Sequence, residues 1–251
     1  MNIVFLLMFS SPFLFGQPIR AEIPDEDYIH ESHSSLVFPG SKEFSNSFFQ
    51  KMANLMLFGE GKINVVHFGG SHIQADIYSN RMRQLLGSYI PNQQGSRGLV
   101  FPFKIAKTNG PYDYSVSYTG NWSSVRNVSK NLDTKLGVSG ISVYTSDTNS
   151  SIQIIFDKKK NLEHNFKRIK VLHELDSLAY SLRWLGRDSA CIHNYPDSGF
   201  SVIELIYPTD TLEFSVQKTD SLQKQFILYG LYLESDEPGI TYNSIGVNGA
   251  S

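Results

Sequence analysis

Cysteine is almost absent from this sequence: Cys191 is the only one among 251 residues. A single thiol excludes an intramolecular disulfide, and it also excludes a zinc site built from cysteine pairs. The histidines and carboxylates form no H-E-x-x-H pattern and no EF-hand loop, so the sequence predicts no metal. The glycines give no complete dinucleotide-binding fingerprint, and we therefore expect no cofactor.

An excess of basic residues is also missing. The 22 Lys and Arg residues are balanced by 24 Asp and Glu residues, which leaves a formal net charge of -2. Nucleic-acid-binding domains carry clustered positive charge that neutralises phosphates, so we expect no nucleic-acid partner. A small or neutral substrate fits this charge balance better. The hydrophobic fraction, 41%, is ample for packed cores.

No apolar run is long enough to span a bilayer comfortably. The first 16 residues are apolar but are interrupted by Pro12, whereas a membrane-spanning helix needs about 20 apolar residues. We interpret residues 1–16 as a signal peptide that is removed on export. This predicts a secreted or periplasmic protein with no transmembrane segment after the signal is removed.

Between residues 42 and 94 the pattern predicts a helix, a strand and a second helix. Apolar residues recur at helical spacing from Phe44 to Met56 and again from Ile73 to Leu86, which indicates two amphipathic helices. Residues 63–68 lie between them and are typical of a short buried strand, which runs into a Gly-Gly-Ser turn. The order strand, tight turn, helix predicts the opening unit of an α/β sheet.

From residue 95 to 236 the character of the sequence changes. Short runs rich in Val, Ile, Tyr, Phe and Thr alternate with Gly, Asn, Asp and Pro, a pattern typical of the antiparallel strands of a β-sandwich. The expected strands are 114–118, 140–144, 151–156, 169–173, 201–206, 212–216 and 226–233. Residues 240–245 then predict a further strand, so the α/β pattern resumes in residues 237–251.

Ser71 stands where the strand gives way to the helix. Unpaired backbone N–H groups at a helix N-terminus favour a bound anion. The glycines before Ser71 allow close approach of a substrate, and its own N–H can help to bind the oxyanion formed when an ester carbonyl is attacked. A serine that merely caps a helix would occupy the same position, so spacing alone leaves both readings open.

Two segments resemble blocks of the SGNH/GDSL hydrolases. Val65-Val-His-Phe-Gly-Gly-Ser-His-Ile-Gln-Ala-Asp76 resembles the first block, in its G-D-S-H-I-Q-A-D variant, with Gly70 where that variant has Asp. Residues 95–102 and 108–111 are similar to the segments that lead into the inserted domain of bacterial surface O-acetylesterases. Tyr242-Asn-Ser-Ile-Gly-Val-Asn-Gly249 resembles the second block.

The resemblance implies an incomplete three-layer α/β/α domain, formed by residues 42–94 and 237–251 and interrupted by an inserted β-sandwich at 95–236. It implies a serine ester hydrolase that removes acyl groups from a carbohydrate or peptidoglycan. Ser71 would be the nucleophile, and the N–H groups of Ser71 and Gly249 would form the oxyanion hole. The family's G-x-N-D and D-x-x-H blocks do not follow within these 251 residues, so whether this chain is itself an enzyme stays open.

The histidines in the sequence offer no obvious replacement for the missing base. His67 lies inside the predicted strand and is most simply a buried, hydrogen-bonded histidine. His72 neighbours Ser71 and is expected to pack or to touch substrate. Asp27-Tyr-Ile-His30 has the spacing of the last block but lies upstream of Ser71, and we interpret it as a coincidence.

The alternative interpretation is that the chain is catalytically incomplete. It would then act as a glycan-binding module built on the β-sandwich, or be an inactive remnant. Aromatic side chains could stack on sugar rings, although most are expected in the core. The candidates are Tyr112, Tyr114, Tyr118, Trp122, Tyr144 and Trp184.

Overall fold

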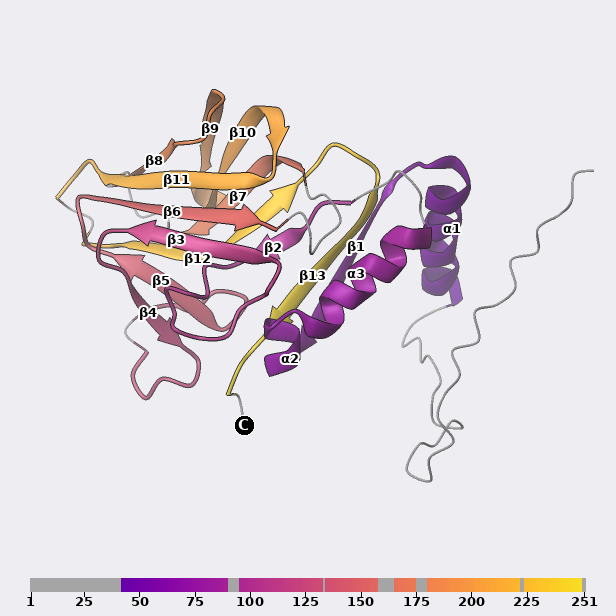
Figure 1. The fold of residues 1–251 in the computed structure, drawn as a ribbon, viewed down its shortest axis with the longest axis horizontal. Coiled ribbons are helices and arrows are strands. Elements are labelled where there is room, and N and C mark those ends of the chain that lie inside the picture. The colour runs from indigo at the N-terminus through magenta and orange to yellow at the C-terminus, as the bar shows by residue number, and fades with distance from the viewer. Residues whose placement is uncertain are drawn as a thin grey trace, which may run out of the picture. The chain divides into compact units, whose positions relative to one another are not determined.

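Antiparallel β-structure dominates the computed structural model. It describes residues 42–89, 95–132, 134–157, 165–174, 180–221 and 224–249. Within these residues there are three α-helices, one short 3-10 helix and thirteen strands (Figure 1). The predicted signal peptide and the Asp27–His30 pattern lie outside the described residues.

The α/β part pairs two strands from opposite ends of the described chain. Its elements are α1 (Lys42–Phe58), β1 (Lys62–Gly69), α2 (Ser71–Gln74), α3 (Ile77–Tyr89) and β13 (Gly239–Gly246). β1 and β13 are parallel and remain in register along their full length. Helix α1 covers one side of this pair, because its buried Leu55 packs against Ile63 of β1, with Ile240 of β13 beside them. Helices α2 and α3 contact β13.

The predicted helix from Ile73 to Leu86 is in fact two helices. Ala75 caps the C-terminus of α2, and Asp76 has a left-handed backbone, with φ of 61°. Its N–H donates to the Ile73 carbonyl at 3.0 Å, which closes the first helix before the second begins. A non-glycine residue rarely adopts this conformation, so sequence periodicity gave no warning of the break.

Two antiparallel sheets form the strand-rich part. One has the order β4-β5-β12-β7-β10-β9 with β2 paired to β12, and the other has the order β3-β6-β11-β8. Their strands are β2 (Gly98–Val100), β3 (Tyr114–Thr119), β4 (Ser123–Arg126), β5 (Ile141–Thr145), β6 (Asn149–Phe156), β7 (Phe166–His173), β8 (Tyr180–Trp184), β9 (Ala190–Tyr195), β10 (Phe200–Thr209), β11 (Thr211–Lys218) and β12 (Phe226–Glu234). The short helix η2 (Pro196–Ser198) links β9 to β10.

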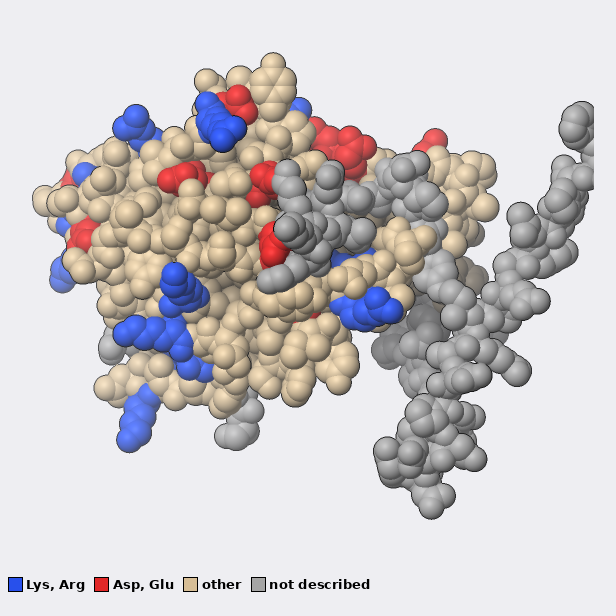
Figure 2. Space-filling view, viewed as in Figure 1, with Lys and Arg blue, Asp and Glu red and all other residues tan. Residues whose placement is uncertain are grey.

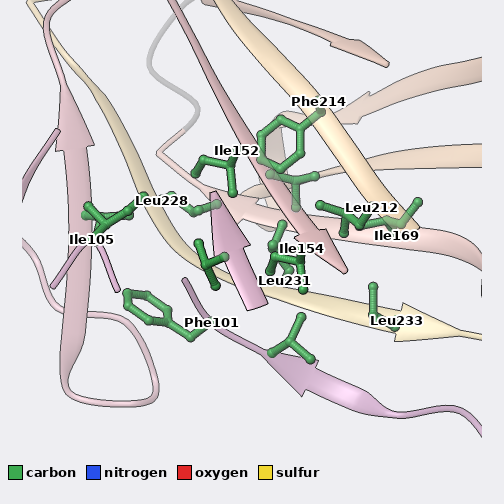
Figure 3. Close-up of a cluster of buried hydrophobic side chains, with 14 of the residues drawn as sticks. Phe101, Ile105, Ile152, Ile154, Ile169, Leu212, Phe214, Leu228, Leu231 and Leu233 are labelled. Carbon is green, nitrogen blue, oxygen red and sulfur yellow. The ribbon is translucent and has the colours of Figure 1, made fainter. Parts of the chain in front are cut away.

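The main core consists of the apolar side chains that these strands bury (Figure 3). Strand β6 shows the alternation behind it: Ile152 and Ile154 are fully buried, whereas Ile155 is 43% exposed. Successive residues of a strand point to opposite faces, so β6 contributes every second residue to this core. Phe214 of β11 and Leu231 of β12 belong to the same buried cluster.

The predicted three-layer α/β/α fold is wrong. Strands account for 48% of the structure and helices for 17%, and only two of the described strands are parallel to each other. A three-layer fold needs a wider parallel sheet with helices on both faces. One face of β1 instead remains open, since Val66 is 46% and Phe68 67% exposed.

The described residues fall within one compact unit, Lys42–Ser251. On the face shown in Figure 2, basic and acidic side chains are scattered among other residues. None of the described helices is long and apolar enough to cross a membrane.

Candidate active site

Ser71 is the first residue of α2 and lies directly beyond the carboxyl end of β1. The Gly70 carbonyl accepts hydrogen bonds from the N–H groups of Ile73 and Gln74, both at 3.1 Å, which starts the helical turn. The Ser71 side chain is half-buried, and among the described residues its hydroxyl has no hydrogen-bond partner. Because α2 is a single turn, its dipole gives less help to a bound anion than the predicted long helix would.

The second block ends beside the first. Val247, directly after β13, donates its N–H to the Gly69 carbonyl at 3.0 Å, which extends the parallel pairing to the Ser71 turn. Gly249 is exposed and has φ of 80°, a conformation that favours glycine. Both predicted site residues therefore lie at the carboxyl edge of the two parallel strands, where open α/β sheets bind their ligands.

Gln74 joins the two blocks, and sequence reasoning assigned it no role. Its side chain is buried, and its Oε1 accepts the Asn248 N–H at 2.7 Å. Its Nε2 donates to the Asn109 carbonyl at 2.6 Å and to Thr108 Oγ1 at 3.1 Å. Gln74 thus fixes the loop that carries Gly249 to the helix that begins with Ser71. The sequence feature that could have pointed to Gln74 is its place in the Ser-His-Ile-Gln run of the first block.

A buried cluster of four charges lies behind α2. Arg97 Nη2 is 2.9 Å from Asp76 Oδ2, and Arg97 Nε is 3.2 Å from Asp113 Oδ2. Arg83 of α3 also pairs with Asp76 and donates to the Tyr242 carbonyl at 3.0 Å. Two carboxylates and two guanidinium groups balance one another here, which is the condition for keeping charges inside a protein.

This cluster shifts the ionisation of its members. Burial alone would raise the pKa of Asp76, but the positive charges of Arg97 and Arg83 outweigh burial and hold that pKa below its ordinary value. Burial, together with the charge of Arg97, lowers the pKa of Arg83 to about 10. Asp76 and both arginines are therefore charged at neutral pH.

Gly70 occupies the position where the resembling motif has Asp, and the backbone there could accept a side chain. Its φ of -85° is ordinary for any residue, and a Cβ built on it would meet no atom within 4 Å. The glycine is therefore not required by the geometry of the turn.

The histidines near Ser71 are engaged elsewhere. His67 Nδ1 lies 3.0 Å from the Tyr242 hydroxyl, and the His72 ring packs against the Tyr78 ring with centroids 5.9 Å apart. Among the described residues, no histidine contacts the Ser71 hydroxyl. His67 is half-buried and hydrogen-bonded, in the manner expected for a structural histidine.

A serine and a histidine do form a close pair in the sandwich. His173 Nε2 is 2.8 Å from Ser201 Oγ, and the Ser201 hydroxyl donates to Asn194 Oδ1 at 2.7 Å. Ser201 has no exposed surface and His173 is 4% exposed, so no ester carbonyl reaches this serine in the folded protein. The pair is a buried polar link between β7, β9 and β10.

The described residues contain no group of three or more His, Cys, Asp or Glu side chains that could hold a metal ion.

No protein-family model and no curated protein matches this chain. A solved structure of a family 32 CBM from C. perfringens NanJ in complex with galactose aligns with a TM-score of 0.28 and 10% identity, over 55% of this chain and 99% of that chain. A solved structure of a peptidoglycan O-acetylesterase aligns with a TM-score of 0.53 and 16% identity, over 81% of this chain. The alignment spans about half of that enzyme, 51% of its chain. The described fold is thus similar to that of part of a peptidoglycan O-acetylesterase.

Proposed function

We propose that this chain carries the nucleophile and the oxyanion hole of an SGNH-type serine esterase that removes O-acetyl groups from peptidoglycan or another polysaccharide. The observation that carries the proposal is the meeting of the two blocks, held by the Val247 to Gly69 and Asn248 to Gln74 hydrogen bonds. The likeness to the fold of a peptidoglycan O-acetylesterase supports the same reading.

In the proposed reaction, Ser71 Oγ attacks the acetyl carbonyl. The N–H groups of Ser71 and Gly249 donate to the oxygen that becomes negative. The intermediate collapses, the sugar hydroxyl leaves with a proton, and an acetyl group stays on Ser71. Water then releases acetate and restores the hydroxyl. A network of Asp76, Arg83, Arg97 and Gln74 positions this edge without touching the reacting atoms.

The proton of Ser71 needs an acceptor. The reaction needs a histidine and a carboxylate beyond the described residues, because no described histidine contacts Ser71. Loss of a triad member costs about 10⁴ to 10⁶ in rate. Because no described residue supplies this base, we expect an added base to raise the rate of acylation.

The test measures acetate release from O-acetylated peptidoglycan, with and without imidazole as a soluble base. Imidazole should raise the rate with the native chain, and mass spectrometry should find the acetyl adduct on Ser71. The Ser71→Ala variant should show neither effect. Ser88→Ala is the matched control, because Ser88 is an exposed serine on α3. Equal rates for the native chain and Ser71→Ala would remove Ser71 from the mechanism.

We also propose export and a two-part organisation. Removal of residues 1–16 as a signal peptide would deliver the protein to the periplasm or the medium, where cell-wall polysaccharide lies. N-terminal sequencing of the protein recovered there tests this, and an intact Met1 would contradict it.

Residues 95–236 would be the insert and residues 42–94 with 237–251 the esterase part, in keeping with the pairing of β1 with β13.

A further inference from the structure

A cavity of about 400 Å³ opens where β8 leads into β9 and β10 leads into β11. This volume lies within the range of small-molecule sites. Figure 1 shows β8 and β9 far from α2, the helix that begins with Ser71. The cavity is therefore separate from the candidate active site. The lining residues with aromatic or charged side chains are Trp184, Arg187, Asp188, Tyr207, Asp210 and Glu213.

Two aromatic side chains line the cavity. Trp184 packs against the edge of the main core, and its buried indole N–H has no acceptor among the described residues. Gly186 holds the following loop against the indole, since any Cβ there would overlap the ring. Tyr207 is 63% exposed. The cavity wall thus offers one fixed ring and one accessible ring.

The polar lining is rich in carboxylates. Asp188, Asp210 and Glu213 line the cavity together with a single cation, Arg187. Glu213 accepts from Gln153 Nε2 at 2.9 Å, and Asp210 Oδ1 accepts from Thr211 Oγ1 at 3.1 Å, so both carboxylates are held in place. Three negative charges against one positive charge disfavour an anionic ligand and favour a ligand with hydroxyl donors.

A pyranose ring matches this combination. One face of the ring presents C–H groups that pack on an aromatic ring, and its edge presents hydroxyls that donate to carboxylates. Tyr114, another aromatic candidate from the sequence, is buried in the core, and Trp122 uses its indole N–H on the Thr119 carbonyl. Of those candidates, Trp184 is the one that lines this cavity.

We propose that this cavity binds a neutral sugar unit of a glycan chain, packed on Trp184 and Tyr207 and hydrogen-bonded by Asp188 and Asp210. The site does not depend on the chemistry of Ser71. It would hold the polysaccharide at the sandwich, at a distance from the proposed esterase edge.

Calorimetric titration of the 251-residue chain tests the proposal with three neutral probes: cellotetraose, galactotetraose and the tetrasaccharide of N-acetylglucosamine. At least one should bind, and polygalacturonate should bind more weakly. Tyr207→Ala and Asp188→Asn should each raise Kd about tenfold or more, since a few aromatic and charged side chains that the ligand covers supply most of the affinity of such sites. Both residues are exposed, so these variants should keep the native circular dichroism, which Trp184→Ala could alter.

Tyr118→Ala is the control for general loss of aromatic surface, because Tyr118 is 40% exposed on β3 and does not line the cavity. It should leave Kd unchanged. Ser71→Ala should also leave Kd unchanged, so that failure of the esterase proposal and failure of this one are separate results. Absence of binding by all three neutral probes at about 10 mM, preference for polygalacturonate, or unchanged Kd in Tyr207→Ala and Asp188→Asn would overturn the proposal.

Discussion

Gln74 Oε1 accepts the backbone N–H of Asn248 at 2.7 Å, across 174 positions of sequence. The same side chain donates to the Asn109 carbonyl at 2.6 Å. One buried amide therefore ties together the Ser71 helix, the loop that carries Gly249 and the start of the strand-rich part. Each of its polar atoms has a partner, which is what a buried amide requires.

Replacement of Gln74 by alanine should destabilise the fold. Gln74→Ala removes three hydrogen bonds and leaves the Asn248 N–H without its acceptor, so we expect a loss of about 1–3 kcal/mol in the free energy of unfolding. Urea unfolding followed by circular dichroism measures it. Gln50→Ala is the matched control, because Gln50 is exposed on α1 and should change stability by less than about 0.5 kcal/mol. Equal stability of the two variants would contradict the role of Gln74.

The buried charge cluster predicts a larger effect. Asp76→Asn leaves Arg83 and Arg97 with too little negative charge, and breaking a buried pair by removing one partner costs about 3–5 kcal/mol. The comparison is Lys135→Ala, which breaks the 2.8 Å pair with Glu174 at a side chain that is 79% exposed. An exposed pair contributes at most about 1 kcal/mol. A loss for Asp76→Asn no greater than that of Lys135→Ala would show that the cluster does not stabilise the fold.

The same cluster predicts a loss of stability in acid. The pKa of Asp76 is lower in the folded protein than its ordinary value, so the unfolded chain binds the proton first as the pH falls. The contribution of Asp76 is fully present above the ordinary aspartate pKa of about 3.9. It is lost as the pH falls through the lowered pKa.

Urea unfolding of the native chain and of Asp76→Asn from pH 7 down to pH 3 checks this dependence. The difference in stability between the two should be constant from pH 7 to about pH 5 and should shrink below that. A difference that stays constant down to pH 3 would mean that folding does not lower the pKa of Asp76.

Many of the strands were predictable, because alternating apolar and polar residues mark them and turn residues separate them. The expected strands 151–156 and 212–216 fall within β6 and β11, where every second residue is apolar and buried. Strands β8 and β9 were missed, because both lie at the edges of their sheets and show little burial. An edge strand can remain polar on both faces, so its sequence gives a weak signal.

At the candidate active site, prediction from the sequence was incomplete for a different reason. The Ser71 turn and the Gly249 loop were predicted from local motifs, and their roles stay predictions. The contacts that join them depend on Gln74, Thr108 and Asn109, whose partners are distant in sequence. The local apolar pattern predicted one helix after Ser71. In the structure, Asp76 has a left-handed backbone between α2 and α3, and its side chain pairs with Arg83.

Glycines 70 and 246 should respond in opposite ways to substitution. Gly70→Asp has room and an ordinary φ, so we expect stability unchanged or higher by a few tenths of a kcal/mol, about the difference between Gly and Asp at a helix N-cap. A Cβ at Gly246 would overlap the backbone nitrogen of Gln74, so Gly246→Ala should cost about 1–3 kcal/mol or more. Thermal unfolding of both variants distinguishes these outcomes. A destabilised Gly70→Asp would show that the turn requires glycine.

The apolar side chains of the α/β part should make the chain associate with itself. Leu57 of α1 is 73% exposed and Phe68 of β1 is 67% exposed, and large exposed apolar surfaces promote association in water. We expect light scattering to rise with protein concentration, and the double variant Leu57→Ser with Phe68→Ser to reduce that rise. Ile155→Ser is the control, because Ile155 is 43% exposed on the sandwich and should leave association unchanged. If Ile155→Ser reduced scattering as much as the double variant, the association would not be specific to the α/β part.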